Sequence, residues 1–222
     1  MTRRVLVLRP APGDAATAER LAAVGLKAIR LPLFEIVPVS WTPPPDDHDV
    51  LLLTSANAVR HAGSGLEIYR TIPTIAVGHA TADAARAAGL DVVAIGNDDA
   101  AAALALAQAR GWRSILRLAG RERTRLHDVT DVVVYASEPL ALPAKALEVA
   151  SGAVALLHSA RAAERFALLT NVGGVQRRDV RLAAISNKVA TAAGAGWGAI
   201  TVAATPDDAG LVIAAATLAI DP

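Results

Sequence analysis

Short apolar runs rich in valine, isoleucine and leucine alternate with alanine-rich stretches along the whole chain. Apolar runs of this length predict buried strands, and the alanine-rich stretches between them predict helices. A strand that is apolar on both faces and is followed by a helix is typical of a parallel sheet covered by helices on both sides. The alternation therefore predicts an α/β fold.

The bounds of the individual elements follow from this pattern, and Asp14 is expected to be the N-cap of the first helix. The expected strands are Val5–Arg9, Lys27–Leu33, Val50–Ser55, Thr74–Gly78, Asp91–Gly96, Ser114–Gly120, Ala153–Ser159, Arg181–Ser186 and Ala199–Thr205. The expected helices are Asp14–Val24, Ala56–Ala62, Ala80–Ala88, Asp98–Arg110, Ala160–Leu169, Lys188–Ala193 and Asp207–Ile220. The apolar part of the last helix is shorter than the about 20 residues of a bilayer span, so we expect a core helix and no membrane partner.

An internal repeat divides the chain into two similar halves. Leu51–Ala62 aligns without gaps with Ala155–Phe166, and Ala76–Gly89 aligns with Ala184–Trp197, at offsets of about 104 to 109 residues. Both repeats run on into a strand and a turn with paired aspartates, at Asn97–Ala100 and Pro206–Ala209. A duplicated α/β unit predicts two similar domains, each a parallel sheet flanked by helices, with a ligand cleft between them.

Two extended stretches that contain prolines mark the expected domain boundaries. Leu31–Asp49 has an extended apolar run followed by three successive prolines, and Asp131–Pro143 is a second extended run that ends in prolines. Proline disfavours helix and stiffens such segments, as in a linker. We expect domain 1 to comprise residues 1–36 and 138–222, domain 2 residues 41–132, and linkers at 37–40 and 133–137. The alternative is a single sheet with long edge strands.

Composition and missing motifs exclude several classes of function. The chain has no cysteine, which excludes disulfide scaffolds, thiolate zinc sites and cysteine nucleophiles. Aromatic residues make up only 3% and the net charge is +1, so nothing favours a nucleic-acid partner. Glycine-rich phosphate loops and the GxSxG elbow are absent, and the histidines lack metal-ligand spacing. We expect no cofactor and no metal.

The amino terminus has two arginines followed by only five apolar residues. That run is too short for a secretory signal, and no small-residue cleavage site follows it. We therefore expect a cytoplasmic protein.

Small hydroxylated or amide residues follow four of the expected strands, at Thr54–Asn57, Gly78–Thr81, His158–Arg161 and Ser186–Lys188. Open α/β sheets bind ligands at the carboxyl ends of their strands, and the N–H groups at the start of the following helix attract anions. Ordinary helix capping is the alternative at each single junction. Four such junctions, two in each half, favour an anion-binding role.

Arginine outnumbers lysine 19 to three, and the loop after Gly120 contains Arg121, Arg123 and Arg125. Guanidinium groups bind carboxylates through two hydrogen bonds, so this loop suits a small molecule with several carboxylates. A solvated surface is the alternative. Arg9 ends the first expected strand, where it either points into the cleft or pairs with a nearby carboxylate.

Tyr135 is one of two tyrosines and closes the apolar run of the second linker. A phenol with a pKa of about 10 can act as a weak general acid. The alternative is a packed tyrosine with a satisfied hydroxyl.

The chain resembles the uroporphyrinogen-III synthase family in a series of short motifs spread over nearly its whole length. In chain order they are RVLVLRP, LPLFEIVPV, LLLTSANAV, AVGHATADAARAAG, VVVY, LLHSARAAERF and AAISNKVATAAGAGW, followed by VAATPDD. The resemblance implies two α/β domains joined by a two-stranded linker, with the active-site cleft between them and one domain built from both chain ends.

The resemblance also implies a reaction. The substrate is hydroxymethylbilane, a linear tetrapyrrole with an acetate and a propionate on every ring, and the product is the cyclic uroporphyrinogen III. Loss of the hydroxyl as water gives an azafulvene, which ring D attacks at its substituted carbon to form a spiro intermediate. Fragmentation and reclosure then leave ring D inverted. The implied enzyme is a cofactor-free, monomeric hydro-lyase of heme biosynthesis that holds one reactive conformation of its substrate.

Individual residues take roles from the same resemblance. Tyr135 matches the family's active-site tyrosine, which assists departure of the hydroxyl, and Thr81 matches its threonine after the Val-Gly turn. The residues expected to bind substrate are Arg9, Ser55, Asn57, Thr81, Gly120, Arg121, Ser159, Arg161, Ser186 and Lys188. Val189 stands where many members have threonine, and the loop over 121–131 is short, which are two departures from the family's pattern.

Two other functions are compatible with the residues alone. One is a non-enzymatic protein whose two α/β lobes close on a polycarboxylate small molecule. The other is a structural or regulatory domain that accompanies a larger tetrapyrrole enzyme.

Overall fold

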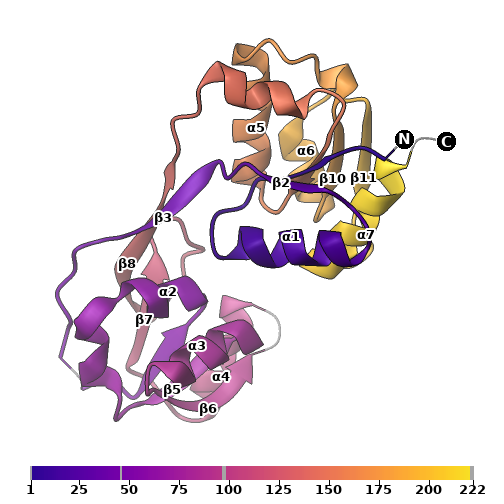
Figure 1. Cartoon of the computed structure of the whole chain (residues 1–222). Helices are drawn as coiled ribbons and strands as arrows, with labels where there is room; N and C mark the ends of the chain where they lie inside the picture. The colour runs from indigo at the N-terminus through magenta and orange to yellow at the C-terminus, as the bar shows by residue number, and fades with distance from the viewer. Residues whose placement is uncertain (1, 46, 97–98, 221–222) are drawn as a thin grey trace. The chain divides into compact units, whose positions relative to one another are not determined.

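The computed structural model describes residues 2–45, 47–96 and 99–220, so the first residue of the expected helix Asp98–Arg110 lies outside the described residues. The chain divides into two compact units (Figure 1). Unit 1 comprises Met1–Glu35 and Pro139–Pro222, and unit 2 comprises Ile36–Glu138. Each unit is built around one sheet.

Unit 1 contains a five-stranded parallel sheet in the order β11-β10-β9-β1-β2. Its strands are β1 (Val5–Val7), β2 (Ala28–Arg30), β9 (Val154–Leu157), β10 (Arg181–Ala184) and β11 (Ala199–Val202). In the central pairing, Val5 of β1 lies opposite Val154 of β9. Parallel strands need crossover connections, and helices of the alanine-rich stretches supply them.

Helices cover both faces of the unit 1 sheet (Figure 1). They are α1 (Gly13–Ala23) and α7 (Asp208–Ala219) on one face, and α5 (Ala160–Val172) and α6 (Asn187–Ala193) on the other. Short 3₁₀ helices span Ala144–Ala150 (η2) and Arg177–Asp179 (η3). Because successive strand residues point to opposite faces, Val5 and Val7 pack with α1 and α7, whereas Leu6 and Leu8 pack on the α5 side.

Unit 2 contains a six-stranded sheet in the order β3-β8-β7-β4-β5-β6. Its strands are β3 (Phe34–Pro38), β4 (Val50–Leu53), β5 (Pro73–Val77), β6 (Asp91–Gly96), β7 (Ile115–Gly120) and β8 (Thr130–Pro139). The pairings from β8 through β6 are all parallel. The expected linkers, 37–40 and 133–137, lie largely in the neighbouring strands β3 and β8.

The unit 2 sheet is also covered on both faces. Helices α2 (Ala56–His61) and α3 (His79–Ala87) and the 3₁₀ helix η1 (Gly63–Tyr69) pack on one face, and α4 (Ala100–Ala109) packs on the other. The aligned repeat segments have the same structure, since Leu51–Ala62 contains β4 and α2 and Ala155–Phe166 contains β9 and the start of α5. The predicted fold class, with two similar parallel-sheet units flanked by helices, is confirmed.

Two details of the sequence prediction are wrong near the amino terminus. Asp14 is not an N-cap, because α1 already begins at Gly13, after Pro12. Pro12 is the N-cap, and the helix therefore begins at Gly13, so that Asp14 lies inside its first turn. The expected strand Lys27–Leu33 is only three residues long, Ala28–Arg30, and Pro32, which has no N–H for a ladder, follows shortly after it.

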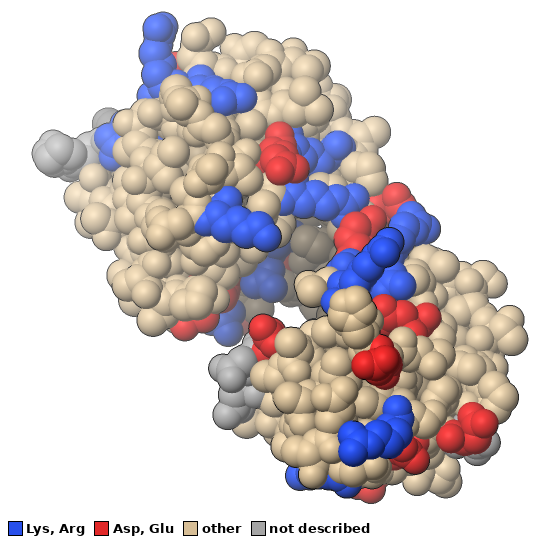
Figure 2. Space-filling view, turned by 180° about the vertical axis from the view of Figure 1, so that it is seen from behind, with Lys and Arg blue, Asp and Glu red and all other residues tan. Residues whose placement is uncertain are grey.

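Charged side chains are interspersed in sign on the face of the molecule in Figure 2, which agrees with the net charge of +1. No helix in the described part of the chain is long and apolar enough to cross a membrane.

Candidate functional site

Each sheet has a point where the direction of chain winding changes. In unit 1 the chain winds from β1 to β2 on one side and from β9 through β10 to β11 on the other, so the switch lies between β1 and β9. In unit 2 it lies between β4 and β7. Open α/β sheets bind ligands outside the carboxyl ends of the strands at such points. The polar groups at these two edges are therefore the candidates for ligand binding.

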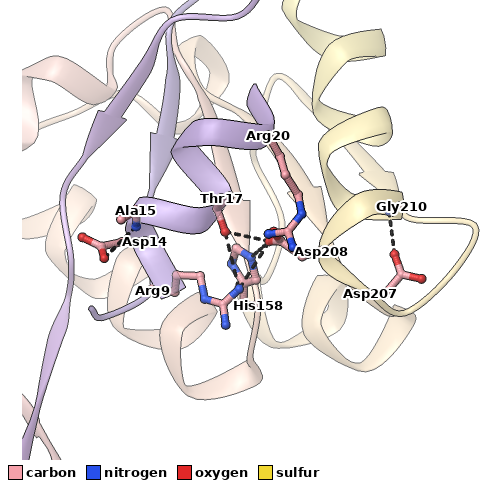
Figure 3. A network of polar contacts seen from close by, with 9 residues as sticks. All are labelled: Arg9, Asp14, Ala15, Thr17, Arg20, His158, Asp207, Asp208 and Gly210. Carbon is pink, nitrogen blue, oxygen red and sulfur yellow. Dashed lines mark hydrogen bonds and ion pairs between the residues drawn. The ribbon is translucent and has the colours of Figure 1, made fainter. Parts of the chain in front are cut away.

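At the unit 1 edge, Asp208 is the centre of a polar network (Figure 3). Its Oδ1 atom accepts hydrogen bonds from the Thr17 hydroxyl at 2.7 Å and from Arg9 Nη1 at 3.3 Å, and lies 2.8 Å from His158 Nε2. Its Oδ2 atom accepts from Arg20 Nη1 at 2.7 Å. The network joins residues that follow β1 and β9 to the middle and last turn of α1 and to the first turn of α7.

The protonation states in this network follow from burial and hydrogen bonding. Burial alone raises the pKa of Asp208, but hydrogen bonds from His158 and Thr17 and the charge of Arg9 outweigh it and lower this pKa to about 2. Burial lowers the pKa of His158 and outweighs the opposing hydrogen bond with Asp208. At neutral pH Asp208 is therefore a carboxylate, and His158 is a neutral imidazole that donates Nε2–H to it.

Arg9 uses only part of its guanidinium in this network. Its Nη1 atom contacts Thr17 and Asp208, while Nε and Nη2 make no hydrogen bond within the described residues, and 34% of the side chain is exposed. The group lies against Gly13, where a methyl on Cα would come within 2.6 Å of Arg9 Cζ. Of the two interpretations of Arg9 from the sequence, pairing with a nearby carboxylate is observed, whereas its place in a cleft stays a prediction.

At the unit 2 edge, Tyr135 lies beside Gly120 on neighbouring strands. The Tyr135 carbonyl accepts from Arg121 N–H at 2.9 Å, and a methyl on Gly120 would lie 2.7 Å from Tyr135 Cζ. Residue 120 must therefore lack a side chain for the phenol to occupy this place. The half-buried Tyr135 hydroxyl makes no hydrogen bond with the described part of the chain, unlike a packed tyrosine with a satisfied hydroxyl.

His61 lies next to Tyr135, with 6.3 Å between the ring centroids and 38° between the ring planes. Burial, helped by the charge of Arg60, lowers the pKa of His61, so this imidazole is neutral at pH 7. His61 also borders a hollow of about 580 Å³ that has Trp41 on its wall. The sequence analysis missed His61, and a lone histidine on a short helix carries no signal that could have identified it.

The arginines that follow β7 are paired within unit 2. Arg121 pairs with Glu138, and Arg123 pairs with Asp131 at 2.9 Å. Arg117, which points inward from β7 and is only 1% exposed, donates to both oxygens of Asp131 at 2.5 and 2.7 Å. Burial raises the pKa of Asp131, but the hydrogen bonds from these two arginines outweigh it and lower this pKa. Asp131 therefore anchors the loop over 121–131.

The serines at the strand–helix junctions are helix caps. The hydroxyls of Ser55, Ser159 and Ser186 accept hydrogen bonds from backbone N–H groups of the following helices at 3.2, 3.2 and 3.4 Å. A capping hydroxyl accepts with oxygen and keeps its own hydrogen free to donate to a ligand. Capping and ligand binding are thus compatible at these positions.

The remaining expected residues lie at the same edges. Asn57 accepts from Arg60, Arg161 lies 4.4 Å from the centroid of the Phe34 ring, and Lys188 is exposed in the first turn of α6. Thr81 is buried in the first turn of α3, whose N-cap, Gly78, offers no side chain. Val189 is buried at the equivalent place in α6.

The expected residues thus divide between the two sheet edges. The edge residues of unit 1 are Arg9, Ser159, Arg161, Ser186 and Lys188, and those of unit 2 are Ser55, Asn57, Thr81, Gly120, Arg121 and Tyr135.

Within the described residues, no group of three or more histidine, aspartate or glutamate side chains could hold a metal ion. The fold and the two edges thus define a doubly wound α/β protein of two units that carries arginine, hydroxyl and amide groups at the carboxyl edges of its sheets, where this class of fold binds ligands.

Comparisons with known proteins identify the family to which this chain belongs. A scan against family models matches residues 15–213 to the family described as Uroporphyrinogen-III synthase HemD. This match covers most of the chain, and the chain belongs to the uroporphyrinogen-III synthase family. The predicted resemblance is confirmed, and family membership favours an enzyme, a cyclising lyase, over a non-enzymatic binding protein.

Solved structures of the family were also found in the comparison of folds. The uroporphyrinogen-III synthetase from Helicobacter pylori 26695 has a TM-score of 0.67 and 18% identity, with 97% of this chain and 99% of that chain covered. A uroporphyrinogen III synthase from the extremely thermophilic bacterium Thermus thermophilus has a TM-score of 0.41 and 17% identity, with 95% of each chain covered. No curated protein sequence matches this chain.

Proposed function

We propose that this protein cyclises hydroxymethylbilane to uroporphyrinogen III, with inversion of the last pyrrole ring and release of one water. Membership of the uroporphyrinogen-III synthase family supports this reaction, which belongs to porphyrin biosynthesis. The substrate carries two carboxylates on each of its four rings, and the arginine and hydroxyl groups at the two sheet edges suit such a molecule.

Tyr135 is the proposed catalytic residue. Its phenol protonates the hydroxyl of the substrate, the carbon–oxygen bond breaks, and water leaves with the bonding electrons. The resulting azafulvene is attacked by the substituted carbon of ring D, and the spiro intermediate fragments and recloses with ring D inverted. The proton that the macrocycle finally loses restores the phenol, so that hydroxymethylbilane gives uroporphyrinogen III and one water.

The free hydroxyl of Tyr135, in β8 beside the last residue of β7, is the observation that carries this assignment. Tyr135 as a residue is half-buried, and its hydroxyl makes no hydrogen bond with the described residues, so its donor is available to a ligand. The phenol packs directly on Gly120, where a Cβ would lie 2.7 Å from Tyr135 Cζ, and this contact fixes the position of the ring. A proton donor has to lie within hydrogen-bond reach of the leaving oxygen, and a fixed phenol at a ligand-binding edge meets that need.

Substrate carboxylates are held by the remaining edge residues in this proposal. In unit 1 these are Arg9, Ser159, Arg161, Ser186 and Lys188, and in unit 2 they are Ser55, Asn57, Thr81, Gly120 and Arg121. The Gly120 contribution is its backbone, and the Arg121 contribution requires exchange of Glu138 for a substrate carboxylate. Fixed donors of this kind hold the chain of rings in one reactive conformation, which lowers the barrier by orientation.

The decisive experiment separates enzymatic from spontaneous closure. The protein is mixed with freshly generated hydroxymethylbilane, the products are oxidised to porphyrins, and the isomers are separated by chromatography. We expect isomer III to dominate, whereas the bilane alone gives the uninverted isomer I. An isomer mixture equal to that of the protein-free control contradicts the proposed function.

Three further points stay predictions. They are that units 1 and 2 are two folding domains, that the active-site cleft lies between these domains, and that the protein is a cytoplasmic monomer. Size-exclusion chromatography with light scattering tests the monomer directly.

A further inference from the structure

We propose that Asp208 is a positioning residue that orients Arg9 so that one edge of its guanidinium is free to bind a substrate carboxylate. This inference rests on the proposed function, because it names a residue that acts through Arg9 on the same polycarboxylate substrate. Neither the sequence repeat nor the family resemblance assigns Asp208 a role.

The first argument is the way in which Asp208 is itself fixed. Its side chain is 15% exposed and its two oxygens have four partners, namely Thr17, His158, Arg9 and Arg20. Thr17 is fully buried, and the His158 side chain is 12% exposed, so both donors are immobile. A carboxylate held by two buried donors has one orientation, and it passes that orientation on to the arginines that bind it.

The second argument is the division of the Arg9 donors. Nη1 points to Thr17 and Asp208, and this leaves Nε and Nη2 as a pair along the other edge of the guanidinium, without hydrogen bonds to the described residues. Two parallel N–H groups match the two oxygens of a carboxylate. Gly13 lies against this same edge, because a Cβ at that position would come within 2.7 Å of both Nε and Nη2, so only a residue without a side chain leaves the edge accessible.

The third argument is electrostatic. Asp208 contributes one negative charge next to the proposed binding edge, Arg9 and Arg20 contribute two positive charges, and His158 is neutral. If Asp208 acted only through its charge, it would weaken the binding of a polyanionic substrate. A positioning role predicts the opposite, so the direction of the change in KM on removing this charge separates the two explanations.

The test is Asp208→Asn, which removes the charge and retains the shape. The positioning role predicts that KM for hydroxymethylbilane rises about tenfold, the scale of one hydrogen bond to a charged group, while kcat changes less than about twofold. An unchanged or lower KM overturns the proposal, because the charge alone would then explain the residue.

Asp207→Asn is the matched control. Asp207 caps α7 by accepting from Gly210 N–H at 2.7 Å, and asparagine caps equally well. This variant removes the same charge one residue away and retains the fold, so we expect its KM to equal the wild-type value or lie slightly below it. A tenfold rise in this control too would overturn the proposal, since the effect would not be specific to Asp208.

A double-mutant cycle with Arg9→Ala shows whether the effect of Asp208 passes through Arg9. We expect Asp208→Asn to have less than about a twofold effect on KM in the Arg9→Ala background. An equal tenfold effect in both backgrounds overturns the proposal. Loss of cyclisation by the wild-type protein is a different result, which would contradict the proposed function itself.

Thr17→Val decides the question if Asp208→Asn does not fold. It removes one donor to Asp208 Oδ1, together with the long contact of 3.4 Å from Arg9 Nη1, without any change of charge and with nearly the same volume. We expect KM to rise about threefold, less than in Asp208→Asn because His158 and Arg20 still hold the carboxylate, with kcat nearly constant. An unchanged KM in a folded Thr17→Val protein overturns the proposal.

Discussion

The two units each place an arginine–carboxylate pair at the carboxyl edge of a sheet, but the two pairs differ in how firmly the acid is held. Asp208, the partner of Arg9 in unit 1, is 15% exposed and binds three further donors. Glu138, the partner of Arg121 in unit 2, is 39% exposed and has no second ion-pair partner among the described residues. The first acid is a fixed support for its arginine, whereas the second can be replaced by a ligand.

A third arginine–carboxylate pair, also in unit 2, is the most deeply buried of the three. Arg117 is only 1% exposed and makes two hydrogen bonds to Asp131, which also binds Arg123. No donor of this pair faces a ligand, so its role is to hold the loop over 121–131. Residue type therefore does not separate support from binding in this protein, whereas burial and the number of partners do.

Arg117→Ala is expected to have the largest effect in this comparison. It leaves the Asp131 carboxylate without its main partner and opens a cavity beside β7, at a cost of about 3–5 kcal/mol in the free energy of unfolding. Denaturant unfolding measures this change. Arg20→Ala, in which a half-exposed arginine leaves Asp208, is the control and costs less than about 1 kcal/mol. Equal costs for the two variants would remove the distinction between the pairs.

Tyr135→Phe tests whether the unit 2 edge supplies a general acid, which the unit 1 edge does not. Loss of a general acid lowers kcat about a hundredfold, while the melting temperature hardly changes, because the hydroxyl has no partner in the described chain. Single-turnover kinetics with isomer analysis measure the effect. A matched change in unit 1, Ser159→Ala, removes a hydroxyl that caps a helix, and we expect it to lower stability by about 1 kcal/mol with kcat almost unchanged. A wild-type rate in Tyr135→Phe would exclude the tyrosine from the mechanism.

Acid should weaken unit 1 in two separate ranges of pH. The folded pKa of His158 is lowered, so its contribution to stability is complete above its ordinary pKa of 6.5 and declines as the pH falls below that value. The pKa of Asp208 falls from 3.8 to about 2, so its contribution, roughly 2 kcal/mol, is present above pH 3.8 and is lost as the pH falls toward 2.

Unfolding free energies measured from pH 8 to pH 2 test both ranges, with His158→Gln and Asp208→Asn as variants. Asp208→Asn should lack the lower range. His158→Gln should lack the upper range and also narrow the lower one, because the hydrogen bond from His158 helps to lower the pKa of Asp208. If Asp208→Asn and the wild type lose stability in parallel below pH 3.8, the strong pairing of Asp208 is contradicted.

Gly120→Ala tests the fixed position of the phenol. The added methyl would lie 2.7 Å from Tyr135 Cζ, so the ring must move. We expect kcat to fall about tenfold, because a small misplacement of a proton donor is costly. The control is Ala119→Gly, in the same strand as Gly120. Gly111→Ala would not serve as a control, because Gly111 has a positive φ that alanine disfavours. A phenol that tolerates Gly120→Ala without loss of rate is not held for catalysis.

The smallest expected effects concern the exposed pair. Glu138→Gln frees Arg121 and lowers KM about two- to threefold, whereas Arg121→Ala raises KM by a similar factor, as is usual for exposed ion pairs. Steady-state kinetics measure both. The direction for Glu138→Gln is opposite to that for Asp208→Asn, so equal directions would contradict the difference between a replaceable and a fixed acid.

Much of the fold was predictable because local signals agree with the final structure. The run Val50–Leu53 is apolar at every position, and only a strand with both faces covered needs that pattern. The serine junctions were predictable for the same reason, since Ser55, Ser159 and Ser186 serve locally as helix caps. Asp14 was misplaced because Pro12 is also a signal for the start of a helix.

The partners of charged residues were not predictable in the same way. Arg9 and Asp208 are 199 residues apart, and His158 and Asp208 are 50 residues apart. The paired aspartates at Pro206–Ala209 were visible as a repeated turn, but nothing in that turn distinguishes the capping Asp207 from Asp208, which contacts three other segments of unit 1.

The sequence by itself determined the class of fold, the duplicated pattern of strands and helices, and the family, because these depend on local periodicity and on short motifs in order along the chain. Only the tertiary structure decided which acid meets which arginine. With 22 basic and 21 acidic residues, many pairings are compatible with the same spacing. The order of the strands brings distant chain segments to one edge, and burial there makes a few of those pairings rigid.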